Sequence, residues 1–225
     1  MRIGIVGAGM IGSTVAKLWV DADHEVLLSS RHPNELDALV TELGERASSG
    51  TPADAAEFGE VLLLTVPLKA LPDLSRDIGS ALAGKTVLDT TNAYEQRDGE
   101  IARQAMRHPR GTAGWSAMLF PQSRWVKAFN TIYYKTLASE AHRSGDPVGI
   151  PLAGDHRDAL ELASRLVRDA GFEPVIVGDL GRGKELEPGT RVYNTGMSAI
   201  ELRRVFAKPT IVAEPEASKG LGTRG

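Results

Sequence analysis

The first 31 residues of this 225-residue chain constrain its fold more than any other segment. Residues 2–6 have the composition of a short buried strand, a helical apolar periodicity runs from Ile11 to Ala22, and residues 24–29 resemble a second strand. A G-x-G-x-x-G motif follows the first strand, and it consists of Gly7, Ala8, Gly9, Met10, Ile11 and Gly12. In this strand–helix–strand context the motif predicts a βαβ unit that binds a dinucleotide.

Each glycine of the motif has a separate task in such a unit. Gly7 permits the tight turn out of the strand, and Gly9 lets the backbone approach a pyrophosphate. Gly12 lets the helix pack closely on the sheet. The unpaired amides and the positive dipole end of the helix then face the phosphates, so we expect the whole motif to form the cofactor site.

The residues after the second strand indicate which dinucleotide binds. An NAD site places Asp or Glu about 20 residues further on, where it bonds the ribose 2′-hydroxyl. This chain has no acid between Val26 and Asn34 and offers Ser30, Arg31 and His32 instead. A guanidinium takes a 2′-phosphate by a forked, charge-assisted contact, which favours NADP(H) over NAD(H). In the alternative, Arg31 is a solvated loop residue, and His32 either covers the adenine or the phosphate or simply belongs to the loop.

Composition excludes several classes of function. The 42% of hydrophobic and 24% of charged residues are ordinary for a globular protein, and the net charge of −3 argues against a nucleic-acid partner. The absence of cysteine excludes disulfides, thiolate metal sites and a cysteine nucleophile. The five histidines lack metal-ligand spacing, so we expect no metal site. No signal peptide or membrane-length apolar run is visible, so we expect a cytoplasmic protein that acts on a small molecule away from membranes.

The order of apolar segments predicts the fold class. The continuous apolar run over residues 61–66 is typical of a parallel strand covered by helices on both faces. We expect an α/β protein with a Rossmann dinucleotide-binding fold, a mainly parallel sheet and a small C-terminal lobe. The expected parts are an NADP-binding domain over 1–145, an α/β lobe over 146–206 that closes the acceptor site, and a flexible tail over 207–225.

Within the expected lobe, local signals predict three details. Asp155 should cap a helix that Gly171 ends. Pro174 marks the strand over 172–177 as an edge or irregular strand. A last helix is expected from about 191 to 205.

Two polar turns are expected to border the nicotinamide half of the cofactor. In an open parallel sheet, ligands bind outside the carboxyl ends of the strands. Two expected strands end in such turns, whose residues are Thr65, Val66 and Pro67 in one and Thr91, Asn92 and Ala93 in the other. Ordinary turn chemistry is the alternative, because Pro, Asn and Thr favour turns anyway.

The sequence indicates no catalytic acid or base. Lys127 is the one candidate near the expected nicotinamide, but a strand position with a packed stem explains it better. Hydride transfer to a flavin-like ring needs little proton chemistry from the protein, because the cofactor carries the reaction. This pattern favours a reductase that passes hydride from NADPH to a ring acceptor.

These motifs carry a family resemblance. The glycine motif, Ser30-Arg31 and Val66-Pro67 are followed by Lys-Ala-Phe-Asn-Thr over 127–131 and Leu-Ala-Gly-Asp over 152–155. In this order they resemble the coenzyme F420-dependent NADP reductase family over about residues 1–205. The layout is also similar to the cytosolic reductase domain of the STEAP metalloreductases, which passes hydride from NADPH to a flavin.

The resemblance implies direct hydride transfer between NADPH and the deazaflavin F420, with the two rings stacked. It implies that Ser30 and Arg31 hold the 2′-phosphate, and that Asn130, Thr131 and Ile132 line the place where the rings meet. It also implies that the loop over 181–187 and the following helix close over the acceptor, and that the protein is a homodimer or a higher homo-oligomer.

The sequence departs from these relatives at its bulky residues. Tyr94 to Asp98 and the pair Tyr133-Tyr134 are expected to reshape the acceptor pocket. An NADPH:flavin reductase using FMN or FAD, or a reductase of a small imine or carbonyl, is therefore the alternative enzyme. A non-catalytic NADPH-sensing protein is the alternative of another class.

Overall fold

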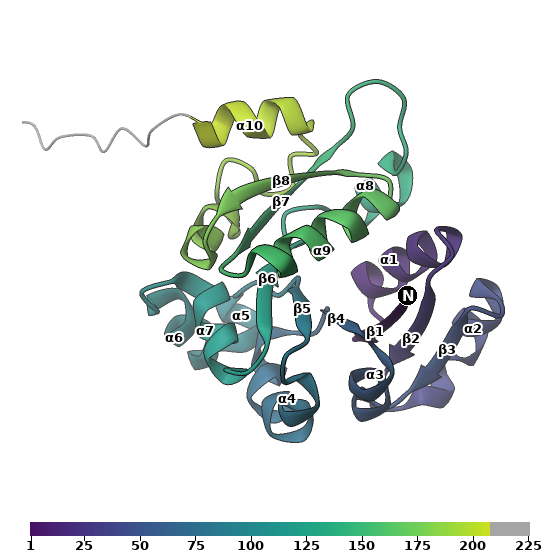
Figure 1. Ribbon diagram of the computed structural model, residues 1–225. Coiled ribbons are helices and arrows are strands. Elements are labelled where there is room, and N and C mark those ends of the chain that lie inside the picture. The colour runs from purple at the N-terminus through teal and green to yellow at the C-terminus, as the bar shows by residue number, and fades with distance from the viewer. Residues whose placement is uncertain (208–225) are drawn as a thin grey trace, which may run out of the picture.

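The computed structural model describes residues 1–207, and it contains an eight-stranded sheet with helices on both faces (Figure 1). The strand order is β3-β2-β1-β4-β5-β6-β7-β8. The strands are β1 (Arg2–Val6), β2 (Glu25–Ser29), β3 (Ala47–Gly50), β4 (Val61–Leu64), β5 (Thr86–Asp89), β6 (Arg124–Lys127), β7 (Gly149–Gly154) and β8 (Glu173–Gly178). All neighbours from β3 to β6 are parallel, so the predicted Rossmann fold is confirmed.

Two sets of helices cover the two faces of the sheet. The helices are α1 (Met10–Asp21), α2 (Asp37–Leu43), α3 (Pro52–Phe58), α4 (Leu71–Ile78), α5 (Glu95–Asp98), α6 (Glu100–Arg107), α7 (Gly111–Leu119), α8 (Tyr134–Glu140), α9 (Arg157–Asp169) and α10 (Ala199–Ala207). Short 3-10 turns are η1 (Pro33–Leu36), η2 (Leu68–Ala70), η3 (Ser80–Leu82) and η4 (Leu180–Leu186). One core cluster packs α1, α8 and α9 on the sheet, and another packs α3, α4, α6 and α7.

The apolar run in β4 supplies side chains to both clusters. Val61 and Leu63 pack in the first cluster, whereas Leu62 and Leu64 pack in the second. Successive strand side chains point to opposite faces, so a strand with helices on both sides must be apolar throughout.

The last two strands continue the same sheet. β7 is antiparallel to β6 over two residue pairs, and β8 is parallel to β7 at the sheet edge, as Pro174 predicts. Helix α9 returns over the first face, where the indole nitrogen of Trp19 in α1 donates to the carbonyl of Leu166 at 2.8 Å. The division near residue 145 into two parts stays a prediction, and from residue 208 the predicted tail lies outside the described residues.

Two local predictions in the C-terminal part are wrong. The expected helix over 191–205 begins only at Ala199, because Asn194 adopts a positive φ of 54° and its amide donates to Thr131 at 2.8 Å. Asp155 does not cap α9, since its carboxylate accepts from Arg110 at 2.6 Å and from the Leu180 amide at 3.1 Å. Both residues are held by long-range contacts, which the local sequence does not encode.

Within residues 1–207, no helix has the length and apolar character needed to cross a membrane.

Candidate active site

The glycine motif forms a tight turn between β1 and α1. Gly7 has φ 105°, and a Cβ on it would come within 2.9 Å of the Thr65 carbonyl oxygen. A Cβ on Gly12 would lie 2.1 Å from the Gly7 oxygen. A Cβ on Gly9 would meet nothing within 4 Å. The fold itself therefore requires the first and third glycines, whereas Gly9 leaves open space that fits a cofactor pyrophosphate.

The N-terminus of α1 is suited to an anion. Gly9 is its N-cap, no side chain of the described residues caps it, and its first turn holds no acid. The first amides of a helix lack intrahelical partners and carry the positive end of its dipole. These features fit a phosphate at this position.

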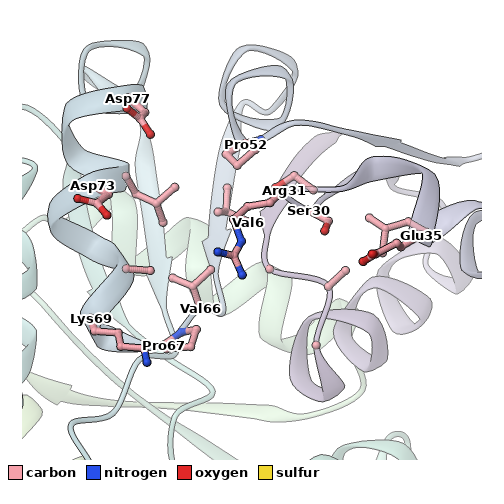
Figure 2. Close-up of a pocket in the computed structure, with 17 residues that line it drawn as sticks. Val6, Ser30, Arg31, Glu35, Pro52, Val66, Pro67, Lys69, Asp73 and Asp77 are labelled. Carbon is pink, nitrogen blue, oxygen red and sulfur yellow. The ribbon is translucent and has the colours of Figure 1, made fainter. Parts of the chain in front are cut away.

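A pocket of about 590 Å³ lies beside this turn, between η1 and α4. Arg31 reaches into it from the end of β2, and Lys69 lies across from it (Figure 2). Three acids also line the pocket, and they are Glu35, Asp73 and Asp77. Of the predicted cofactor residues, Gly7, Ala8, Gly9, Ser30, Arg31, Val66 and Pro67 line this pocket.

A second pocket of about 540 Å³ shares Gly9, Val66 and Pro67 with the first. It extends past the carboxyl ends of β4, β5 and β6. Of the predicted residues, Met10, Ile11, Thr65, Thr91, Asn92, Asn130 and Ile132 line it. Four predicted residues border neither pocket: Gly12, Ala93 and Thr131 are buried, and His32 is exposed.

All four tyrosines of the chain line the second pocket, and they are Tyr94, Tyr133, Tyr134 and Tyr193. The hydroxyls of Tyr94 and Tyr193 are hydrogen bonded to each other. Burial, and then this hydrogen bond, raises the pKa of Tyr193 above its ordinary value, so its phenol stays protonated. The Tyr133 and Tyr134 rings meet edge to face with centroids 4.7 Å apart. Sequence analysis noted three of these rings as bulky but did not bring them together with Tyr193.

Arg97 is the one charged side chain among the residues that line the second pocket. Its guanidinium lies 4.9 Å from the centre of the Tyr94 ring and donates to the Asn92 carbonyl at 2.8 Å. Asp98, whose side chain is fully buried, accepts from Arg97 at 2.8 Å. Burial raises the pKa of Asp98, but hydrogen bonds from Arg97, from the Tyr94 amide and from the Lys69 amide together hold it below its ordinary value.

Asn92 and Asn130 bind each other across the ends of β5 and β6. The side-chain amide of Asn92 donates to the backbone carbonyl of Asn130 at 2.9 Å. The side-chain amide of Asn130 donates to Asn92 Oδ1 at 3.1 Å and to the Leu186 carbonyl at 2.7 Å. Phe129, just before Asn130, has φ +56°, a left-handed conformation that is uncommon outside glycine. Strained backbone of this kind clusters at functional sites, and here it turns the chain so that Asn130 faces Asn92.

Lys127 does not reach either pocket. Its side chain is fully buried, in agreement with the packed strand position expected for it, and its ammonium pairs with the buried Asp89 at 3.0 Å. Sequence analysis did not foresee this partner. Within the described residues there is also no cluster of His, Asp and Glu that could hold a metal.

The chain is similar in sequence to known reductases. Residues 2–93 match the family model described as NADP oxidoreductase, coenzyme F420-dependent. The F420-dependent NADP reductase of Methanothermobacter marburgensis is 31% identical over 201 residues, which cover 83% of this chain and 88% of that protein. The metalloreductase STEAP3 of Rattus norvegicus is 27% identical over 186 residues, so this chain spans only about a third (36%) of that protein.

The fold of a solved structure is also similar. A crystal structure from Arthrobacter sp. FB24, described as a candidate F420-dependent NADP reductase, has a TM-score of 0.70 at 20% identity and covers 88% of this chain and 99% of its own. At this identity the likeness concerns the fold alone. Taken with the sequence match to the reductase of Methanothermobacter, the chain belongs to the F420-dependent NADP reductase family and is an NADP-dependent oxidoreductase.

Proposed function

We propose that this protein transfers hydride directly between NADPH and the deazaflavin ring of coenzyme F420. The observation that carries the proposal is the second pocket, where all four tyrosines gather and no carboxylate lines the walls. Aromatic faces and edges pack well against a flat ring, and hydride transfer between two rings needs orientation more than acid or base. The family match supports the same acceptor.

In this proposal NADP(H) binds across both pockets. The open space at Gly9 and the N-terminus of α1 would hold the pyrophosphate, and Ser30 and Arg31 would hold the 2′-phosphate. The nicotinamide would then extend past Val66 and Pro67 into the second pocket. When bound, NADPH supplies the hydride.

The residues of the second pocket would orient the acceptor and keep water away. Thr91 and Asn92 border the nicotinamide side, and Asn130 and Ile132 border the acceptor side. The tyrosine rings cover the acceptor from the loops after β5 and β6 and before α10. Residues that hold two rings face to face would provide the near-attack geometry that hydride transfer requires.

The test is a direct assay of transfer in both directions. Purified protein mixed with NADPH and oxidised F420 should bleach the deazaflavin absorbance band, and reduced F420 with NADP⁺ should restore it. Absence of change in both directions would refute the proposal. Activity with FMN or FAD but none with F420 would select the flavin reductase, and tight NADPH binding without oxidation by any acceptor would select the sensor.

One observation favours a small imine or carbonyl as a second candidate acceptor. Reduction of such a group requires a proton, and the Tyr193 hydroxyl, which lines the pocket, would be the group that donates it. Replacing Tyr193 by Phe should then abolish imine or carbonyl reduction while leaving F420 reduction within about threefold, because only the former needs the proton.

Assembly and location are part of the same proposal. We expect a homodimer, which light scattering of the purified protein would test. We also expect a cytoplasmic location, because NADPH and F420 are cytoplasmic reductants, and cell fractionation would test it.

A further inference from the structure

A fully buried ion pair lies directly behind the second pocket. Asp89 ends β5 and Lys127 ends β6, and the two residues are register partners in the sheet. Both side chains have zero exposure. Among the ion pairs of residues 1–207, this is the one whose two side chains are both completely buried.

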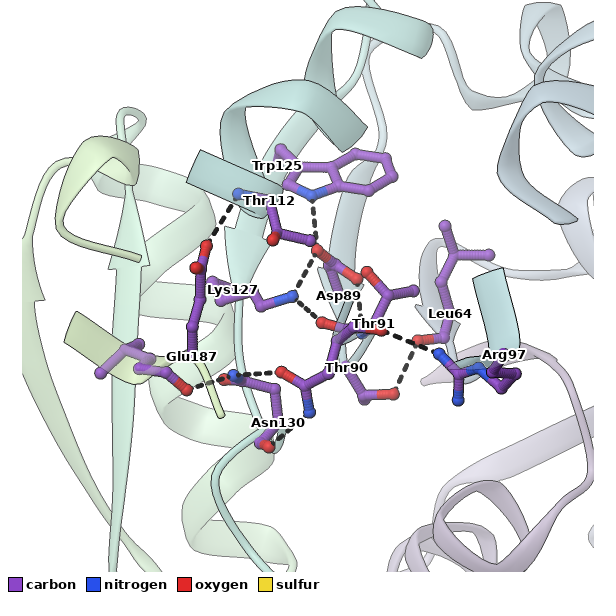
Figure 3. Close-up of polar contacts among 12 residues, drawn as sticks. Leu64, Asp89, Thr90, Thr91, Arg97, Thr112, Trp125, Lys127, Asn130 and Glu187 are labelled. Carbon is purple, nitrogen blue, oxygen red and sulfur yellow. Dashed lines mark hydrogen bonds and ion pairs between the residues drawn. The ribbon is translucent and has the colours of Figure 1, made fainter. Parts of the chain in front are cut away.

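The pair holds both backbone polar groups of Thr91 (Figure 3). Asp89 Oδ1 accepts from the Thr91 amide at 2.7 Å, and the Lys127 ammonium donates to the Thr91 carbonyl. Asp89 Oδ2 accepts from Lys127 at 3.0 Å and from the Trp125 indole at 3.2 Å. The peptide groups on both sides of Thr91 are therefore fixed by charged partners, whose hydrogen bonds are the stronger kind.

Stability alone does not account for such a pair. Burial of two charges carries a desolvation cost, and well-packed apolar residues of similar size often replace a buried pair without loss of stability. Here the two charges instead act on a segment that borders a ligand pocket, because Thr91 and Asn92 both line it. Asn92 in turn binds Asn130, so the contacts run from the buried pair to both sides of the pocket.

We propose that Asp89 and Lys127 are positioning residues that fix the Thr91–Asn92 backbone against the nicotinamide end of NADP(H). They touch neither ring and act through Thr91. This inference rests on the proposed function in one respect, namely that the second pocket receives the nicotinamide. It does not depend on which acceptor follows.

The decisive variant is the double replacement Asp89→Asn with Lys127→Met, compared with each single replacement. Each single change leaves a buried group without its partner and should lower the melting temperature, whereas the double change removes both charges and should recover most of it. NADPH affinity should change less than about threefold in the double variant, because phosphate contacts at Gly9 and Arg31 are untouched. Turnover should fall by roughly 10- to 100-fold, since small misplacement of a reacting ring has effects of this size.

Two readouts separate positioning from a structural role. The fluorescence of bound NADPH reports the surroundings of its nicotinamide, and we expect the enhancement on binding to be much smaller for the double variant than for the wild type. With stereospecifically deuterated NADPH, the double variant should transfer hydride from one face of the nicotinamide ring less strictly than the wild type does. A double variant that recovers melting temperature, fluorescence and turnover together would overturn the proposal.

Arg124→Gln provides the matched control. Arg124 lies on the same strand β6, and its ion pair with Asp158 is at the surface, away from both pockets. This variant should leave NADPH fluorescence and turnover unchanged, and an equal loss in it would overturn the assignment to the buried pair.

A second variant covers the case in which the double variant does not fold. Trp125→Phe keeps an aromatic ring beside Phe120, removes the indole hydrogen bond to Asp89 and loses part of a buried ring, while leaving the ion pair itself in place. It should lower turnover by about threefold with unchanged NADPH affinity. Wild-type fluorescence and turnover in this variant would then count against the proposal. Changed NADPH fluorescence without any F420 turnover would support the positioning role while refuting F420 as acceptor.

Discussion

Arg31 is one of two basic side chains that line the pocket beside the glycine turn. Its guanidinium enters a pocket that also contains Lys69 and three acids, so the net charge of the lining is not positive (Figure 2). Asp73 is paired with Arg76, which removes one of these acids from the balance. We expect selectivity for a 2′-phosphate to depend most on Arg31, because it follows β2, where the ribose of a dinucleotide binds in this fold.

Replacing Arg31 by Ala should weaken NADPH binding far more than NADH binding. A hydrogen bond to a charged group contributes about 1.5–3 kcal/mol, so we expect the Kd for NADPH to rise roughly 10- to 100-fold and the Kd for NADH to stay within about twofold. Isothermal titration with both nucleotides provides the measurement. Arg31→Lys is the control, because it keeps the positive charge but cannot make the forked, two-donor contact of a guanidinium with a phosphate. Equal losses for both nucleotides would argue against the assignment.

Asn130 lines the second pocket. Its amide makes two hydrogen bonds, to Asn92 and to the Leu186 carbonyl, and Asn130→Ala removes both. Turnover should therefore fall by more than tenfold while the Kd for NADPH changes little, because the phosphate contacts remain. Stopped-flow reduction together with a binding titration distinguishes the two effects. If turnover is unaffected, Asn130 does not belong to the site.

At the scale of elements, α5 depends on the carboxylate of Asp98. This side chain accepts from the Tyr94 and Lys69 amides and from Arg97, and so joins the start of α5 to η2 and to the pocket wall. Its lowered pKa means that the ionised form is bound more strongly in the folded protein than in the unfolded chain. The ionised carboxylate therefore stabilises the fold above its unfolded pKa of 3.8.

Replacing Asp98 by Asn should make the protein less stable at neutral pH, by about 1–3 kcal/mol, because charged hydrogen bonds are lost. The difference from the wild type should shrink as the pH falls below about 4, where the wild-type carboxyl also becomes protonated. Urea unfolding at neutral and acid pH measures this difference. A difference that is constant over the whole range would contradict the role given to the charge.

Some elements follow from local sequence and others do not. Thr51 and Asp54 form the capping box that begins α3, with Pro52 at its first position, so residues within a single turn are enough to start this helix. By contrast, the start of α10 depends on the contact of Asn194 with Thr131, and Asp155 is engaged by Arg110 instead of by a helix. Caps and periodicities act within a few residues, whereas these contacts join residues far apart in the chain.

At the scale of the whole molecule, one sheet carries the complete cleft. The first core cluster includes Ile3 of β1 together with Ile150 of β7 and Leu166 of α9, so the N-terminal and C-terminal parts share packing. That Gly7, Gly9 and Arg31 line one pocket could be predicted, because these residues lie close in sequence. The gathering of the four tyrosines at the second pocket could not be predicted, because Tyr94 and Tyr193 are 99 positions apart and only the fold brings them together.

Because the core is shared, we expect residues 1–207 to unfold in one cooperative transition. Trp19→Phe removes the hydrogen bond to Leu166 and part of a fully buried ring, and should lower the free energy of unfolding by about 1–3 kcal/mol without splitting the transition. Urea unfolding followed by circular dichroism and by fluorescence should give coincident curves. Two separate transitions in the wild type would instead indicate that the C-terminal part folds independently.

Because every tyrosine of the chain lies at one pocket, tyrosine can serve as a selective NMR probe of that pocket. Uniform incorporation of 3-fluorotyrosine would place four fluorine nuclei in this pocket and none elsewhere in the chain. Adenosine 2′,5′-bisphosphate, which resembles only the adenosine half of NADP, should leave the four ¹⁹F resonances nearly unmoved. A ring acceptor should shift several of them at once, so a single one-dimensional spectrum reports which half of the cleft a given molecule occupies.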